Sequence, residues 1–209
     1  MPAAVQAGIG DSIKLYTEKP PKGARHNFGL AAYRNWAEML TNPKQKGSWA
    51  KEFPAGPKLY AGLTCAFWDI NIFGKDGRTE RDVCADFLDE ASLILGKPDL
   101  RNVAQQFRAS AVAWDDLSVA LLPDWSLPLA ETRQLKLRQH RLFLDEGVAS
   151  LAERQAISQR LKDIRGQVED DFPLTEAEVV RLQEDIAAEV LRIHPIEAAA
   201  VAELRGAMG

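Results

Sequence analysis

The sequence contains few residues of the kinds that build metal sites or disulfide frameworks. Its 209 residues include two cysteines and three histidines. Cys65 and Cys84 do not form a Cys-x-x-Cys pair, and no Glu-x-x-His pair of the kind found in di-iron helical bundles occurs. We therefore expect no metal and no cofactor. Both cysteines lie within apolar helical patterns, which favours buried free thiols over a catalytic cysteine–histidine pair.

The sequence also has little that would direct the chain into a membrane or onto nucleic acid. No apolar run approaches the roughly 20 residues needed to cross a bilayer. The first five residues lack the basic and apolar regions of a secretory signal. A net charge of −4 argues against nucleic acid as the main partner. Free thiols suit a reducing compartment, so we interpret the protein as cytoplasmic.

What the sequence does contain is helical periodicity, which predicts an all-α, compact multi-helix domain. Residues 1–26 contain glycines and a Pro-Pro pair and are expected to form an irregular, linker-like arm. The helical domain is expected over 27–209, where apolar residues recur every three or four positions. Residues 58–73 are apolar nearly all round, which predicts a central, buried helix.

A long antiparallel helical hairpin is expected over residues 129–209. Its first arm is rich in charged residues and is divided near Gly147. Thr175 and Glu178 have the spacing of a capping box, which predicts where the second arm begins. Pro195 is expected to kink or interrupt that last helix.

Several stretches, in order along the chain, resemble the C-terminal domain of the butirosin-biosynthesis protein H-like family. The opening stretch runs from Asn27 to Ala37 and continues as Leu-Thr-Asn-Pro-Lys over 40–44. The other similar pieces are Trp49 with Phe53-Pro54, the glycine break over 74–77, the segment 85–91 before Leu95-Gly96, and the turn over 170–174. The resemblance covers about residues 25–205.

This resemblance implies a role beside a catalytic module. Such proteins usually carry an N-terminal module similar to papain-like cysteine peptidases, and the namesake moves an aminoacyl group from an acyl carrier protein onto an aminoglycoside amine. That acyl transfer needs a thiol activated by a histidine. No cysteine precedes residue 27, so enzymatic activity in this chain stays open. The implied function is a helical companion domain, with a cysteine-peptidase-like module or an acyl carrier protein as partner.

The candidate substrate-binding residues are Asp86, Glu90, Arg81 and Trp49. Asp86 and Glu90 lie one turn apart on one helix face, where they can orient a cationic substrate or pair with Arg81 or Arg78. The alternative, which we favour, is a solvated face or a structural ion pair to another helix. Trp49 lies in the basic stretch 44–58 and is expected to face a partner or another module.

Three functional hypotheses follow from these patterns. The first is the companion domain of a thiol-dependent acyltransferase or peptidase-like system. The second is a free-standing scaffold that forms a homodimer through the leucine and isoleucine spine of residues 129–205. The third, which the sequence favours least, is an independent small-molecule enzyme that works from the Asp86–Glu90 face.

Overall fold

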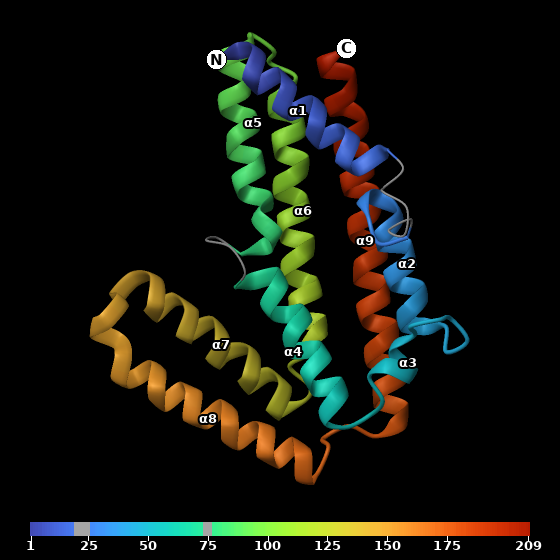
Figure 1. Cartoon of the computed structure of the whole chain (residues 1–209), viewed down its shortest axis with the longest axis vertical. Helices are drawn as coiled ribbons and strands as arrows, with labels where there is room; N and C mark the ends of the chain where they lie inside the picture. The colour runs from blue at the N-terminus through green and yellow to red at the C-terminus, as the bar shows by residue number, and fades with distance from the viewer. Residues whose placement is uncertain (19–25, 73–76) are drawn as a thin grey trace.

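The computed structural model describes residues 1–18, 26–72 and 77–209, and the regular structure within these ranges is entirely helical (Figure 1). The all-α prediction is therefore confirmed. The elements in chain order are α1 (Pro2–Thr17), α2 (Gly29–Thr41), α3 (Trp49–Glu52), α4 (Pro57–Asn71), the 3-10 helix η1 (Arg78–Glu80), α5 (Arg81–Leu95), α6 (Leu100–Leu121), α7 (Leu127–Glu146), the 3-10 helix η2 (Gly147–Ser150), α8 (Leu151–Asp170) and α9 (Glu176–Met208).

The bundle is organised around α6 and α9, which run side by side along its long axis. Figure 1 shows α6 between α5 and α9, and α2 packs along α9. The buried residues of α9 recur at three- and four-residue intervals from Val179 to Leu204. Such a stripe favours burial of one helix face along the whole length of the element. The length of α9 thus joins the two ends of the bundle.

Two clusters of buried side chains form the core. The first joins α2, α4, α6 and α9 and includes Phe67 and Leu117. The second lies toward the other end of α9, where α1, α5 and α6 meet it, and includes Ile9, Leu88 and Phe107. Burying a side chain of this size stabilises the fold by about 1.5–3 kcal/mol.

The expectation that residues 1–26 form an irregular arm is wrong for residues 2–17, which are α-helical. Ile9 and Ile13 of this helix are buried in the second cluster. Its C-terminal end lies so close to the start of α2 that a Cβ on Gly29 would stand 2.5 Å from the carbonyl oxygen of Tyr16. Only glycine fits there, and its φ of +57° also favours glycine. The Pro-Pro pair at 20–21 lies outside the described residues.

The antiparallel hairpin is formed by α7 and α8 rather than by the whole of 129–209. The chain reverses at Gly147, as the sequence indicates, and Figure 1 shows this pair of helices extending sideways from the bundle. The capping box of Thr175 and Glu178 begins α9 as predicted. Helix α9 then packs on α6 and α2, because its long apolar stripe is buried against the apolar residues of those two helices.

Pro195 neither ends nor interrupts α9, which continues to Met208. Proline removes one backbone hydrogen bond, to the carbonyl four residues earlier. That carbonyl belongs to Leu191, whose side chain is 48% exposed, and Pro195 is itself exposed. The unpaired carbonyl therefore lies on the side of the helix that faces water.

Helix α4 buries one face only. Leu59, Leu63 and Phe67 are fully buried, whereas Trp68 is 42% exposed. Cys65 is exposed and Cys84 is half-buried, so the prediction of two buried thiols is wrong. Among the described residues, none of the helices combines the length and apolarity that a membrane span requires.

Candidate functional site

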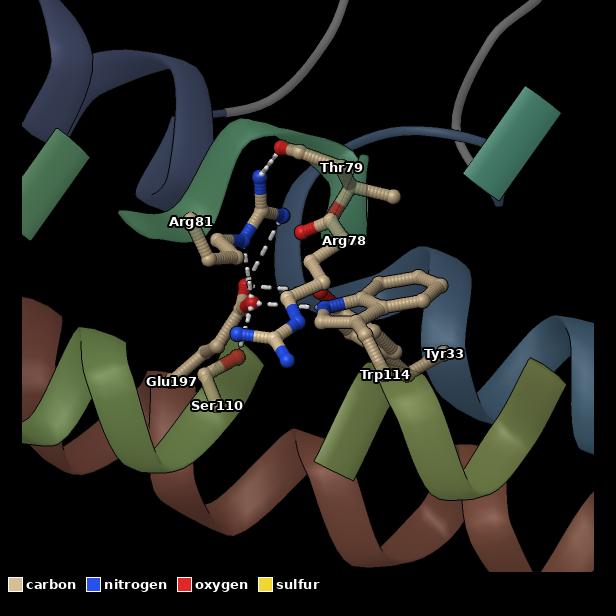
Figure 2. Close-up of polar contacts among 7 residues, drawn as sticks. All are labelled: Tyr33, Arg78, Thr79, Arg81, Ser110, Trp114 and Glu197. Atoms are coloured by element: carbon tan, nitrogen blue, oxygen red, sulfur yellow. Dashed lines mark hydrogen bonds and ion pairs between the residues drawn. The ribbon is translucent and has the colours of Figure 1, made fainter. Parts of the chain in front are cut away.

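The carboxylate of Glu197 lies at the centre of the bundle, one half-turn beyond Pro195 on α9. Its side chain has no exposed surface. Arg81, the first residue of α5, donates from Nε to Oε1 at 2.6 Å and from Nη2 to Oε2 at 3.3 Å. This is a nearly parallel pair of charge-assisted hydrogen bonds, an arrangement that arginine makes well with a carboxylate (Figure 2).

Three neutral donors also form hydrogen bonds with Glu197 (Figure 2). The Tyr33 hydroxyl of α2 donates to Oε2 at 2.6 Å. From α6, the Ser110 hydroxyl donates to Oε1 at 2.7 Å and the Trp114 indole donates to the same atom at 3.2 Å. A buried charge is tolerated only when it is paired and hydrogen-bonded, and here three helices, α2, α5 and α6, supply the partners of Glu197 on α9. We call these residues (Tyr33, Arg81, Ser110, Trp114 and Glu197) the Glu197 network.

The network holds its charges as an ion pair. Burial raises the pKa of the Glu197 carboxyl, but the charge of Arg81 and the donated hydrogen bonds outweigh burial and leave the pKa below its ordinary value. Burial and the nearby carboxylate both raise the pKa of Tyr33. The tyrosine therefore stays protonated and keeps donating to Glu197 at neutral pH.

A strained turn leads into the network. Arg78, Thr79 and Glu80 of η1 have φ values of 51°, 51° and 59°, in the left-handed region that L-residues rarely adopt. Arg81 Nη1 donates to the carbonyl of Thr79 at 2.9 Å. Arg78 forms ion pairs with Asp82 at 3.0 Å and with Asp115 on α6 at 2.8 Å. These charged contacts hold a backbone conformation that costs of the order of 1–3 kcal/mol per residue.

Beside this turn lies an apolar groove with aromatic walls. One cavity of about 580 Å³ is lined from α1, α2, η1, α5 and α6, and an adjoining one of about 660 Å³ is lined from α2, α3, α4, η1 and α6. Both are lined by Trp36, Thr79 and Trp114. The ring centroids of Tyr33 and Trp114 are 6.0 Å apart, and the Arg81 guanidinium lies 5.7 Å from the Trp114 ring centroid. We call the two cavities together the aromatic groove.

The four candidate residues from the sequence are not brought together. Arg81 belongs to the Glu197 network. Trp49 is 7% exposed, so it does not face outward toward a partner as expected. Its ring centroid lies 5.1 Å from that of Phe53 in a tilted arrangement, and it lines the second cavity. Asp86 instead accepts a hydrogen bond at 2.7 Å from Arg108 of α6. This is the structural ion pair that we favoured as the alternative. Glu90 is exposed on the surface.

The residues that sequence reasoning missed lie on the apolar faces of their helices. Glu197 is the clearest case, because Ile193, Ala200 and Leu204 are buried on the same face of α9. A carboxylate at a core position of a helix signals a buried partner. The sequence therefore contained a signal that Glu197 is buried. It did not indicate which residue pairs with it, because Arg81 lies 116 residues away along the chain.

Among the described residues, no group of three or more histidine, cysteine or acidic side chains is arranged to hold a metal ion. Burial raises the pKa of the Cys84 thiol, and this disfavours the thiolate needed for nucleophilic attack. The Glu197 oxygens already accept several hydrogen bonds, so the carboxylate serves to fix the walls of the groove.

Comparison with known proteins identifies no relative: no family model matches the chain, and no curated protein or solved structure is significantly similar to it. The geometry of the site therefore carries the functional inference.

Proposed function

We propose that this protein is a binding domain whose aromatic groove receives a neutral, ring-containing part of a ligand. The observation that carries the proposal is the shared lining of the two cavities by Trp36, Thr79 and Trp114. Ligand sites are typically concave, mostly apolar, and about 300–1,000 Å³ in volume. Both cavities fall within this range.

The charge at the base of the groove supports a neutral occupant. Arg81 lines the first cavity, but its Nε and Nη2 are engaged by Glu197 and its Nη1 by Thr79. An anionic ligand would have to compete with a buried carboxylate at 2.6 Å. Polar groups near α2 remain for orientation, since Asn27 and Asn35 also line the cavity.

We propose further that this binding serves a partner catalytic module, as the resemblance to the butirosin protein H-like family implies. The groove would then hold the ring-bearing part of an acceptor while the partner supplies the thiol. A cysteine-peptidase-like module encoded beside this chain, and a complex of the two purified proteins, would support the pairing. Finding no such neighbour would remove it and leave the binding proposal intact.

Filling the groove tests the binding proposal directly. Ala32 is half-buried and lines the first cavity. A phenyl ring there would occupy the space, so Ala32→Phe should weaken binding of the neutral fluorescent probe N-phenyl-1-naphthylamine about tenfold or more, which corresponds to about 1.4 kcal/mol. The measurement is a titration followed by the rise in probe emission.

The matched control is Ala31→Phe, which adds the same ring to the same helix outside the aromatic groove. It should bind the probe like the unaltered protein, and circular dichroism should show both variants equally helical. Equal loss in the two variants, or no loss in Ala32→Phe, would contradict a site in the groove.

A second candidate function is self-association through the end of the α7–α8 hairpin. Four apolar side chains are exposed there, namely Phe143, Leu144, Val148 and Leu151. The most exposed of them is Val148, at 84%. Figure 1 shows this end of the hairpin pointing away from the bundle, where a second copy of the chain can meet it. Clustered exposed apolar residues mark interaction sites.

We expect the chain to form a dimer in light-scattering measurements over a range of concentrations, and Val148→Asp to return it to a monomer. A charge at the centre of an apolar interface is costly, because it loses water without gaining a partner. A strict monomer at high concentration would exclude self-association.

A further inference from the structure

A separate pocket, distinct from both cavities of the aromatic groove, lies where the α7–α8 hairpin meets α4. Its volume is about 350 Å³. Trp68 and Ile72 line it from the end of α4, and Phe143 and Leu144 line it from α7. The hairpin contacts the bundle chiefly through α4. Small-molecule sites are often found in such clefts between packed helices.

The polar residues of this pocket are all basic or neutral. Lys136, Gln139 and His140 line it from α7, and Arg154 lines it from α8. No aspartate or glutamate is among the lining residues. The pocket thus combines positive charge with aromatic and aliphatic walls, whereas the aromatic groove has its charge neutralised internally.

Lys136 is a cation without an anionic partner in the part of the chain that the structure describes. Its ammonium lies 5.1 Å from the ring centroid of Trp68, a cation–π contact. Burial lowers the pKa of the Lys136 ammonium, and the thiol of Cys65 is the group that acts to raise it. A desolvated ammonium is stabilised most by an anion placed beside it.

Two further groups in the pocket, His140 and Arg154, can also interact with an anion. The Nε2 atom of His140 is buried without a hydrogen-bond partner. Leaving a buried polar atom unpaired is costly, and a ligand oxygen that accepts a hydrogen bond from this nitrogen would satisfy it. The Arg154 guanidinium lies 5.3 Å from the Phe143 ring centroid, held by its hydrogen bonds to Ser150 and Gly147.

We propose that this pocket binds a small aromatic carboxylate, with Lys136 and His140 binding the carboxylate and Trp68 and Phe143 contacting the ring. The carboxylate of the ligand would act as the counter-ion of Lys136, which has no anionic partner among the described residues. The rings offer apolar area and stacking surfaces for a planar body. The modest volume limits the ligand to about one or two fused rings, and the inference does not depend on what the aromatic groove binds.

The test uses 2-naphthoate and its neutral analogue 2-naphthalenemethanol as probes of the full chain, with affinity measured by isothermal titration calorimetry. We expect 2-naphthoate to bind at least tenfold more tightly than the alcohol. Lys136→Met, which keeps the length of the side chain and removes the charge, should weaken 2-naphthoate about tenfold and leave the alcohol unchanged. Tenfold corresponds to about 1.4 kcal/mol.

Lys162→Met on α8 is the matched control, because Lys162 is exposed and is not a lining residue of this pocket. It should bind 2-naphthoate like the unaltered protein. Amide chemical-shift changes in the unaltered protein provide a readout independent of any variant, and they should cluster over residues 136–154. Equal affinity for acid and alcohol, shifts centred elsewhere, or equal losses in both lysine variants would overturn the proposal.

Discussion

Glu197→Ala is expected to lower the free energy of unfolding by about 3–5 kcal/mol, the usual cost of breaking a buried ion pair from one side. The substitution leaves the Arg81 guanidinium, which is only 21% exposed, without its counter-charge. It also leaves Tyr33 and Ser110 without an acceptor for hydrogen bonds of 2.6 Å and 2.7 Å. Urea unfolding followed by circular dichroism measures the change.

A double replacement separates the ion pair from the rest of the network. Because Arg81→Met with Glu197→Leu removes both charges, it should cost less than the sum of the two single substitutions. The difference is the coupling energy of the pair. Additive losses would show that the Arg81–Glu197 contact contributes nothing specific to stability.

The pH dependence of stability reports on the same carboxylate. Its pKa in the folded state lies below the ordinary value of 4.5. The unfolded state therefore binds a proton first as pH falls, and the stabilisation is complete above about pH 5 and is lost as pH falls through the folded-state pKa. Glu197→Gln mimics the protonated acid, so its stability should differ most from that of the unaltered protein above pH 5 and converge with it in acid.

Ile9→Ala is expected to lower the free energy of unfolding by about 2–4 kcal/mol, because it leaves a cavity in a packed core. The Ile9 side chain is 1% exposed and belongs to the cluster that α1 forms with α5, α6 and α9. A flexible arm would predict almost no change. This single substitution therefore distinguishes a docked α1 from a linker.

Leu15→Ala is the control for the N-terminal helix. Leu15 is 58% exposed on the same helix, so its truncation should change the stability by less than about 0.5 kcal/mol. The expected result is a clear difference between the two urea midpoints. Similar midpoints for Ile9→Ala and the unaltered protein would mean that α1 adds nothing to the core in solution.

The helices themselves could be predicted from local sequence because their signals are local. Gly96 ends α5 with a φ of +64°, and the Thr175–Glu178 box begins α9 as its spacing indicates. Helix α1 was missed because its local signals are weak. Gly8 and Gly10 lower the helix propensity of this segment, and what holds it in place is its contact with α9 and α5.

The candidate site depended far more on tertiary structure. Arg81 was selected from the sequence as a partner for Asp86, yet it pairs with Glu197 while Asp86 pairs with Arg108. All four residues carry charges of the right sign, so sequence alone could not choose between the pairings. Burial made the choice, because a carboxylate inside the bundle needs its counter-ion far more than one at the surface does.

By itself, the sequence determined that this protein is a bundle of helices, because periodicity and capping act within a few residues of each other. It also indicated the scarcity of metal-binding and nucleophilic groups. The tertiary structure decided which helices pair, that α9 joins α6 and α2 rather than the hairpin, and that Glu197 lies beside an aromatic groove. Those outcomes depend on contacts between residues far apart in the chain, where packing and desolvation outweigh local preference.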